Sequence, residues 1–256
     1  MLTNLRHIHK PETLDEAADL LKQSGVYPLY GSGASLARVE GQAEEGVDLT
    51  GIVSDQYHID KTALWIGSRT TLSALAASNP EIDKVVRDDL PEAERAALTV
   101  GDVLLECAPY SLTLAMLVGF KAHLYLHAAD PLPIEDWFNL SPDERRQKIV
   151  LSVSFPEYFN GTWRLVVEKV PPDKPVVAAI GFARGGSSVT SVMMFYFAMC
   201  GLADRPIRYK ARDVSTLQSQ LDDSLGSAQY RTETARAVAN RVIMQAIMLA
   251  QQGKQE

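Results

Sequence analysis

Hydrophobic and polar residues alternate with a helical period at the start of this chain. Apolar positions recur every three or four residues over residues 14–24, and Thr13 and Glu16 have the spacing of a capping box. Residues 26–30 then read as a short strand, in which Pro28 indicates an edge or irregular position. The pattern therefore predicts a capped helix followed by a short strand, with a glycine-rich turn at the end of that strand.

The middle of the chain continues this alternation. Strands are predicted at residues 46–49, 62–67, 123–126 and 149–155, and helices at residues 70–78, 91–98 and 112–120. The last of these helices carries almost no polar side chain, so it is expected to be buried on all sides. Residues 99–103 are expected to form a compact loop.

The last third of the chain has a different pattern. Residues 164–170, 176–182 and 189–197 predict three consecutive strands of an antiparallel meander, and two helices follow at residues 214–225 and 230–251. The sequence therefore predicts an α+β fold in which two small α/β subdomains precede a C-terminal antiparallel three-stranded sheet with a helical bundle. The expected parts are residues 1–56, 57–162 and 163–256.

Composition narrows the class of protein. The 256 residues include 46% hydrophobic and 22% charged residues, which is typical of a globular domain. A formal net charge of −7 argues against nucleic acid or an anionic membrane as the main partner. No apolar run approaches the ~18 residues of a membrane span, and no secretory signal is recognisable, so a cytoplasmic protein is expected.

Few residue patterns point to catalysis. Cys107 and Cys200 lack the spacing of a metal site or a disulfide framework, and Cys107 is interpreted as a small buried residue. His123 and His127 could share one face of a strand, but are interpreted as solvent-facing polar residues rather than a metal pair. Two acidic pairs are interpreted as solvated helix ends: Asp88-Asp89 and Asp222-Asp223. No catalytic residue and no metal site is therefore predicted.

The turn after the first predicted strand is the clearest candidate for binding. Its sequence is Gly31-Ser32-Gly33-Ala34-Ser35. Glycine permits positive φ and close approach of a ligand, so several backbone N–H groups could point into one concavity and hold phosphate oxygens. The Ser35 hydroxyl could be a further donor. An ordinary turn is the alternative, and the fuller GxGxxG arrangement of a Rossmann site is absent.

Several segments occur in the order known from one protein family. They are Thr13-Leu14-Asp15-Glu16-Ala17, the stretch from Leu29 to Leu36, Val47-Asp48-Leu49, Ile66-Gly67 with Thr70-Thr71, Thr99-Val100-Gly101-Asp102-Val103, and Tyr230-Arg231 with Arg241. This order resembles the FAD-binding (medium, PCMH-type) subunit of the molybdenum hydroxylases, the group that contains xanthine dehydrogenase and aerobic carbon monoxide dehydrogenase. The resemblance spans nearly the whole chain.

The resemblance implies an electron-transfer subunit with FAD as its cofactor. FAD would lie between the first two subdomains, and backbone amides of two loops would hold its pyrophosphate. The implied cofactor-binding residues are Gly31, Ser32, Gly33, Ala34, Ser35 and Leu36 in the first loop, and Thr99, Gly101 and Asp102 in the second. The implied partners are an iron–sulfur small subunit and a molybdopterin large subunit, or a second copy of this chain. The chain would at most be the flavoprotein subunit of a larger oxidoreductase.

The second loop departs from the family's Thr-Ile-Gly-Gly-Asn sequence. Asp102 stands where the family has its second glycine, and Val103 where it has asparagine. At ~4 Å and an effective dielectric constant of about 20, an aspartate would repel a phosphate by roughly 4 kcal/mol. The Ser-Asp-Leu that often follows this loop reads Ser111-Leu112-Thr113, without its acid. The alternative is therefore a relative that keeps the fold as a structural subunit and no longer binds FAD.

Overall fold

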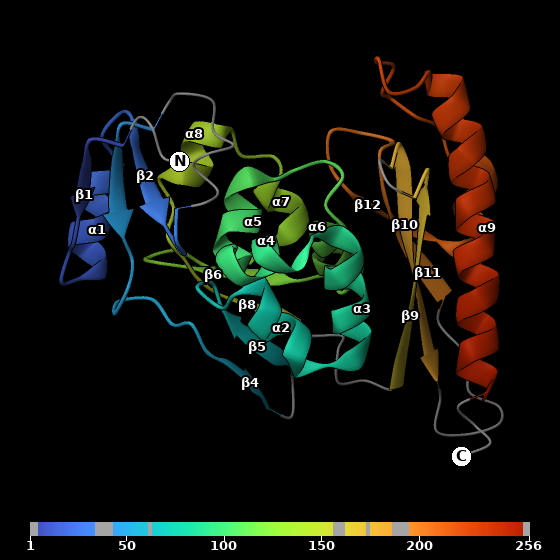
Figure 1. The fold of residues 1–256 in the computed structure, drawn as a ribbon, viewed down its shortest axis with the longest axis horizontal. Helices are drawn as coiled ribbons and strands as arrows, with labels where there is room; N and C mark the ends of the chain where they lie inside the picture. The colour runs from blue at the N-terminus through green and yellow to red at the C-terminus, as the bar shows by residue number, and fades with distance from the viewer. Residues whose placement is uncertain are drawn as a thin grey trace. The chain divides into compact units, whose positions relative to one another are not determined.

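The computed structural model describes residues 5–33, 43–60, 63–155, 162–172, 175–185 and 195–252 (Figure 1). The chain forms two compact units. Unit 1 contains Met1–Ser78, Leu90–Cys107 and Ala122–Pro156, and unit 2 contains Asn79–Asp89, Ala108–Lys121 and Glu157–Glu256. The chain therefore contributes two short segments to unit 2 before its last part completes that unit. The division of the chain after residues 56 and 162 stays a prediction.

Unit 1 begins with a three-stranded parallel sheet. Strands β1 (His7–His9), β3 (Glu45–Asp48) and β2 (Val26–Leu29) lie in the order β1-β3-β2, and helix α1 (Leu14–Leu21) packs against β2 and β3. β2 is an edge strand, as Pro28 predicted, because proline cannot donate a ladder hydrogen bond. The hydrophobic pattern does not reveal β1, since its residues are mostly exposed.

The start of α1 differs in one bond from the predicted capping box. The Thr13 hydroxyl accepts the Glu16 N–H at 3.2 Å, as predicted. The Glu16 carboxylate, however, accepts the N–H of Glu12 at 3.0 Å rather than that of Thr13. Both side chains therefore cap the helix, but the returning bond reaches one residue further back.

A second sheet of unit 1 has five strands in the order β4-β5-β8-β6-β7. Its antiparallel strands are β4 (Tyr57–Ile59), β5 (Leu64–Gly67), β6 (His123–Leu126), β7 (Leu132–Pro133) and β8 (Val150–Phe155). The helices of this part are α2 (Leu72–Ser78), α4 (Glu92–Ala97), α5 (Val100–Glu106), α7 (Ile134–Trp137) and α8 (Pro142–Arg146). The strands and helices predicted in this region are confirmed, with small shifts at their ends.

Unit 2 is built around a four-stranded antiparallel sheet in the order β12-β11-β10-β9. Its strands are β9 (Thr162–Val170), β10 (Val177–Gly185), β11 (Phe195–Cys200) and β12 (Ile207–Lys210). Helix α9 (Ala228–Gln252) packs on one face of this sheet, and α3 (Pro80–Asp89) and α6 (Leu112–Gly119) pack on the other (Figure 1). The predicted meander is confirmed, although residues 189–194 of its third predicted strand lie outside the described residues, and β12 adds a fourth strand to the three that were expected.

The predicted helix at residues 214–225 is not formed. A short 3₁₀-helix, η2 (Ala211–Thr216), and a bridge between Asp223 and Gly226 occupy this stretch. The helices of unit 2 therefore flank both faces of the sheet and do not form the expected bundle after it, as far as the described residues extend. None of the helices in the described ranges is both long and apolar enough to cross a membrane.

Alternate residues of β10 face the two helical layers of unit 2. Ala179 and Ala183 pack in a core that includes α9, whereas Phe182 on the opposite side joins a cluster of aromatic rings. Gly181 faces α9, and a Cβ at this position would come within 2.7 Å of the Val242 carbonyl oxygen. Small residues on this face of β10 therefore let α9 lie close to the sheet.

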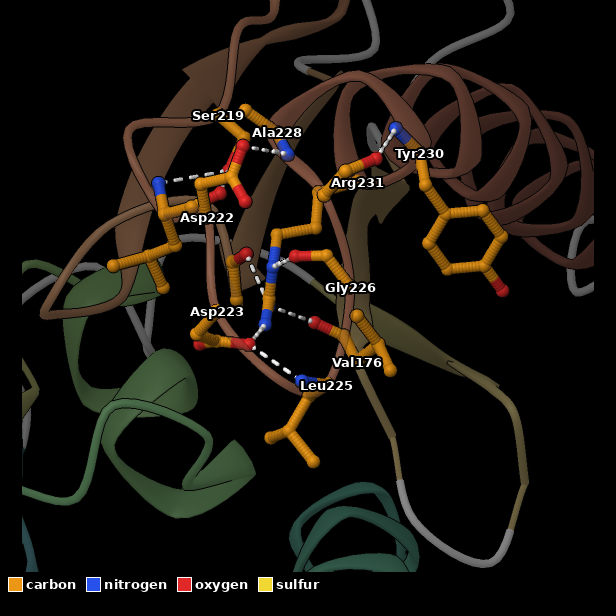
Figure 2. Close-up of polar contacts among 12 residues, drawn as sticks. Val176, Ser219, Asp222, Asp223, Leu225, Gly226, Ala228, Tyr230 and Arg231 are labelled. Carbon is orange, nitrogen blue, oxygen red and sulfur yellow. Dashed lines mark hydrogen bonds and ion pairs between the residues drawn. The ribbon is translucent and has the colours of Figure 1, made fainter.

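Arg231, near the start of α9, forms hydrogen bonds with several connecting segments of unit 2. Its side chain is completely buried. The hydrogen-bond acceptors are the carbonyl oxygens of Val176 (2.9 Å), Gly201 (3.0 Å) and Gly226 (3.0 Å), the Tyr110 hydroxyl (3.1 Å) and Asp223 Oδ1 (2.6 Å). Figure 2 shows Asp223, Gly226 and Val176 converging on the guanidinium. Since a buried charge is costly unless it is paired and hydrogen-bonded, these contacts fix the surrounding segments to α9.

Asp222 and Asp223 are exposed, as predicted, and they also brace the start of α9 (Figure 2). Asp222 Oδ2 accepts the Ala228 N–H at 3.4 Å, and Asp223 Oδ1 accepts the Leu225 N–H at 2.8 Å in addition to Arg231. The hydrogen bond from Leu225 lowers the pKa of Asp223 against the opposing effect of burial, and Arg231 lowers this pKa further.

Replacing Arg231 by methionine is expected to lower the free energy of unfolding by about 3–5 kcal/mol, because buried carbonyl groups and Asp223 lose their donor. Arg241→Met on the same helix is the matched control, since Arg241 is partly exposed and its ion pair with Glu168 spans 3.6 Å. Urea unfolding followed by circular dichroism measures both variants. Equal losses in the two variants would contradict the role assigned to Arg231.

Acid is expected to destabilise the protein partly through Asp223. Its pKa is lowered in the folded state, so its contribution is fully present well above the unfolded pKa of about 3.9 and is lost as the pH falls through the lower folded value. Asp223→Asn should therefore reduce the change of stability between about pH 6 and pH 3. Urea midpoints at a series of pH values measure this difference. If the urea midpoints of wild type and variant change in parallel with pH, Asp223 does not contribute to the acid destabilisation.

Candidate functional site

The structure describes the first part of the first predicted loop. Gly31, Ser32 and Gly33 follow β2 and Tyr30, and Gly33 has a positive φ of 77°. Three further predicted site residues lie outside the described residues: Ala34, Ser35 and Leu36. The Ser32 hydroxyl donates to the carbonyl oxygen of Ala97 at 3.3 Å, which ties this turn to the segment before the second loop.

The two predicted loops lie against each other in unit 1. A Cβ added at Gly31 would come within 2.9 Å of Asp102 Oδ2 and within 2.9 Å of Thr99 Cγ2. Glycine is therefore required at this position, because a side chain would push the Asp102 carboxylate away. The structure thus brings together predicted site residues from both loops.

Residues 99–103, expected as a compact loop, are the N-cap and first turn of α5. The Thr99 hydroxyl accepts the Asp102 N–H at 3.2 Å. In return, Asp102 Oδ2 accepts the Thr99 N–H at 2.9 Å and the Thr99 hydroxyl at 2.7 Å. Thr99 and Asp102 therefore form a reciprocal capping box, and the Asp102 side chain is completely buried within it.

Every backbone N–H group of residues 99–103 already has an acceptor. Thr99 and Asp102 donate to each other's side chains. The other three donate to main-chain oxygens: Val100 to Thr70 at 3.0 Å, Gly101 to Ser68 at 2.7 Å, and Val103 to Thr99 at 3.2 Å. A ligand could therefore gain a backbone donor here only by breaking a bond that the protein already makes.

The Asp102 carboxylate occupies the place where a helix start attracts an anion. The helix dipole and the N–H groups of the first turn favour negative charge at this position. Asp102 supplies that charge from the chain itself, and a phosphate at ~4 Å would be repelled by roughly 4 kcal/mol. The residues present at the second loop therefore do not fit the pyrophosphate of FAD.

Tyr30 covers the second loop from another side. Its ring packs on Gly101, where an added Cβ would overlap the ring atoms. The Tyr30 hydroxyl accepts the Val150 N–H at 2.8 Å and donates to the Lys148 carbonyl oxygen at 3.4 Å. Burial raises the pKa of this hydroxyl well above its usual range.

Arg69 supports the first loop from within unit 1. Its Nε donates to the Tyr30 carbonyl oxygen at 3.1 Å, and its Nη2 donates to the Thr50 hydroxyl at 3.0 Å. A third donor, Nη1, reaches the Val53 carbonyl oxygen at 3.5 Å. Arg69 therefore fixes the residue immediately before Gly31 to the segment that follows β3.

A second aspartate caps a helix in unit 2. Asp89 Oδ1 accepts the Leu112 N–H at 2.8 Å, and Asp89 Oδ2 accepts the Thr113 N–H at 2.8 Å and the Ser111 hydroxyl at 2.9 Å. The prediction that Asp88 and Asp89 are merely a solvated helix end is therefore wrong for Asp89. α3 therefore supplies a carboxylate to the start of α6.

The remaining candidate residues form no reactive site. His127 pairs with Asp15 at 2.8 Å, and no group of three or more His, Cys, Asp or Glu within the described ranges could hold a metal ion. Burial raises the pKa of Cys107 to about 11 and raises that of Cys200 well above its ordinary value. Neither thiol is therefore activated as a nucleophile.

Neither a family model nor a curated protein matches this chain. Solved structures do match. A chain of the carbon monoxide dehydrogenase from Hydrogenophaga pseudoflava, which lacks the Mo-pyranopterin moiety of the molybdenum cofactor, superposes with a TM-score of 0.78 at 18% identity, over 96% of this chain and 98% of that chain. A chain of the reconstituted CO dehydrogenase from Oligotropha carboxidovorans gives a TM-score of 0.77 at 19% identity, over 94% and 96%.

Quinoline 2-oxidoreductase from Pseudomonas putida 86 also matches, with a TM-score of 0.75 at 17% identity, over 96% of this chain and 98% of that chain. Identities this low carry information about the fold alone. The matches confirm the α+β fold that the order of sequence segments predicted. This chain therefore has the fold of the matched chains of carbon monoxide dehydrogenase and quinoline 2-oxidoreductase.

Proposed function

We propose that this chain is a subunit of a multi-subunit molybdenum hydroxylase, in the place that the FAD-binding subunit takes in that family. The observation that supports this most is the extent of the structural match, which covers 96% of this chain and 98% of the Hydrogenophaga chain. Two chains that share nearly all their elements can occupy the same place in a complex, even when their sites differ.

The proposed partners are an iron–sulfur small subunit and a molybdopterin large subunit. Neither metal centre would need ligands from this chain, and the part of the chain that the structure describes offers no cluster of metal-binding side chains. The chemistry on the substrate would belong to the molybdenum-containing subunit, which would also determine the substrate.

Within such a complex, a structural role is favoured over electron transfer through FAD. In the family, the pyrophosphate would be held by backbone amides of both loops. Here Asp102 and neighbouring main-chain oxygens already accept the donors of the second loop, and Tyr30 covers Gly101. The chain would then stabilise the complex without holding a flavin.

An FAD-binding electron-transfer subunit is the second candidate function. The first loop favours it, because Gly33 has positive φ and such glycine-rich turns can aim backbone N–H groups at an anion. Gly31, Ser32 and Gly33 would then contact the pyrophosphate, and FAD, when bound, would supply the redox chemistry of the subunit. The bonds between Thr99 and Asp102 would have to break for the second loop to take part.

Affinity purification of the tagged chain from its native cells is expected to yield a complex with two further subunits, one containing molybdenum and one containing iron–sulfur clusters. Mass spectrometry identifies the subunits, and elemental analysis measures molybdenum and iron. Recovery of the chain alone, or only as a self-association product, would contradict the proposal. Flavin released from the same complex by acid separates the two candidates, since stoichiometric FAD is expected only for the electron-transfer subunit.

A further inference from the structure

We propose that the Asp102 carboxylate takes the place of a ligand's phosphate at the second loop, so that this part of the protein is complete without a bound nucleotide. The inference deepens the proposed function and rests on it for the assignment of residues 99–103 to a flavin loop. It identifies a side chain of the protein itself as the anion that the loop holds.

Hydrogen bonds to Asp102 already engage two donors of the second loop. A helix start leaves N–H groups that need acceptors. Asp102 Oδ2 accepts both the N–H and the hydroxyl of Thr99, at 2.9 and 2.7 Å. Hydrogen bonds to a carboxylate are stronger than those between neutral groups. A phosphate would therefore have to displace Asp102 before it could accept the same two donors.

Burial distinguishes this capping box from an ordinary one. Ser141 and Glu144 exchange the same pair of bonds at the start of α8. Glu144 is exposed, so water can replace it as an acceptor, whereas Asp102 is completely buried. Loss of the Asp102 carboxylate would leave the Thr99 N–H buried without an acceptor, which costs more than loss of a solvated bond.

Tyr30 closes the same place by steric means. Its ring lies on Gly101. Its hydroxyl is held by two hydrogen bonds at the start of β8, because it accepts the Val150 N–H and donates to the Lys148 carbonyl oxygen. The ring is therefore held over the backbone that a phosphate would need to approach. Asp102 accepts the two donors of Thr99, and Tyr30 fills the space over Gly101, so two independent features oppose a phosphate at the second loop.

The same arrangement occurs independently in unit 2. Asp89 accepts the N–H groups of Leu112 and Thr113 and the Ser111 hydroxyl, all within 2.9 Å. These residues stand where the family has its Ser-Asp-Leu, the other segment that the resemblance connects with cofactor binding. At both places, a buried or half-buried aspartate of the chain accepts donors of the helix start.

Amide hydrogen exchange on the full-length protein tests the proposal. In wild type, residues 99–103 are expected to exchange slowly, and millimolar FAD or ADP is expected to leave their rates unchanged. Asp102→Ala should speed exchange in these residues by about tenfold or more, which corresponds to the loss of one hydrogen bond to a charged group. Glu144→Ala is the matched control from the exposed capping box, and it should leave residues 99–103 as in wild type.

Slower exchange of residues 99–103 in the presence of FAD would overturn the proposal, and so would rates that Asp102→Ala leaves unchanged. If that variant does not fold, Asp102→Asn replaces it, because asparagine keeps the size and one acceptor oxygen but not the charge. It should give a smaller acceleration in the same residues, and an unchanged rate would again overturn the proposal. Co-purification with the molybdenum and iron–sulfur subunits is measured separately, so failure of the inference and failure of the proposed function are distinguishable.

Discussion

Backbone N–H groups at buried helix starts must find acceptors, and in this protein two aspartate side chains provide part of them. Asp102 serves α5 in unit 1, and Asp89 serves α6 in unit 2. Each carboxylate is held by donors of the same chain, so neither helix start needs a bound anion. The turn at Gly31 packs against Asp102, and Arg69 holds the preceding residue. The shape of the candidate site therefore depends on the position of one carboxylate.

Some helices could be predicted from the sequence. α6 is an example, because its almost uniformly apolar residues indicate burial on all sides, and the long α9 lies where the second C-terminal helix was expected. β1 and β4 could not be predicted, since their short, exposed sequences form strands only by pairing with distant segments. Residues 214–225 have helix-like spacing but fold irregularly, because Asp223 is fixed to Arg231 by a contact that local propensity cannot anticipate.

Both segments of the candidate site could be identified from the sequence, but the direction in which the Asp102 side chain points could not be predicted. Charge alone marks this residue as a repulsive group in a phosphate site. The spacing of Thr99 and Asp102 is also that of a capping box, and this signal could have identified the helix start. Tyr30 and Asp89 gave no comparable signal, because their contacts with Gly101 and with α6 join segments that are distant in the sequence.

Arg231 also has a consequence for the order in which unit 2 folds. α9 follows every other described element of this unit in the sequence, yet it supplies the guanidinium that binds the Val176 and Gly201 carbonyl oxygens and covers one face of the sheet. During synthesis, the four strands leave the ribosome before the helix that covers them, with an apolar face open to water. The sheet cannot reach its final packing before α9 has been made, and until then it is the surface on which a chaperone would act.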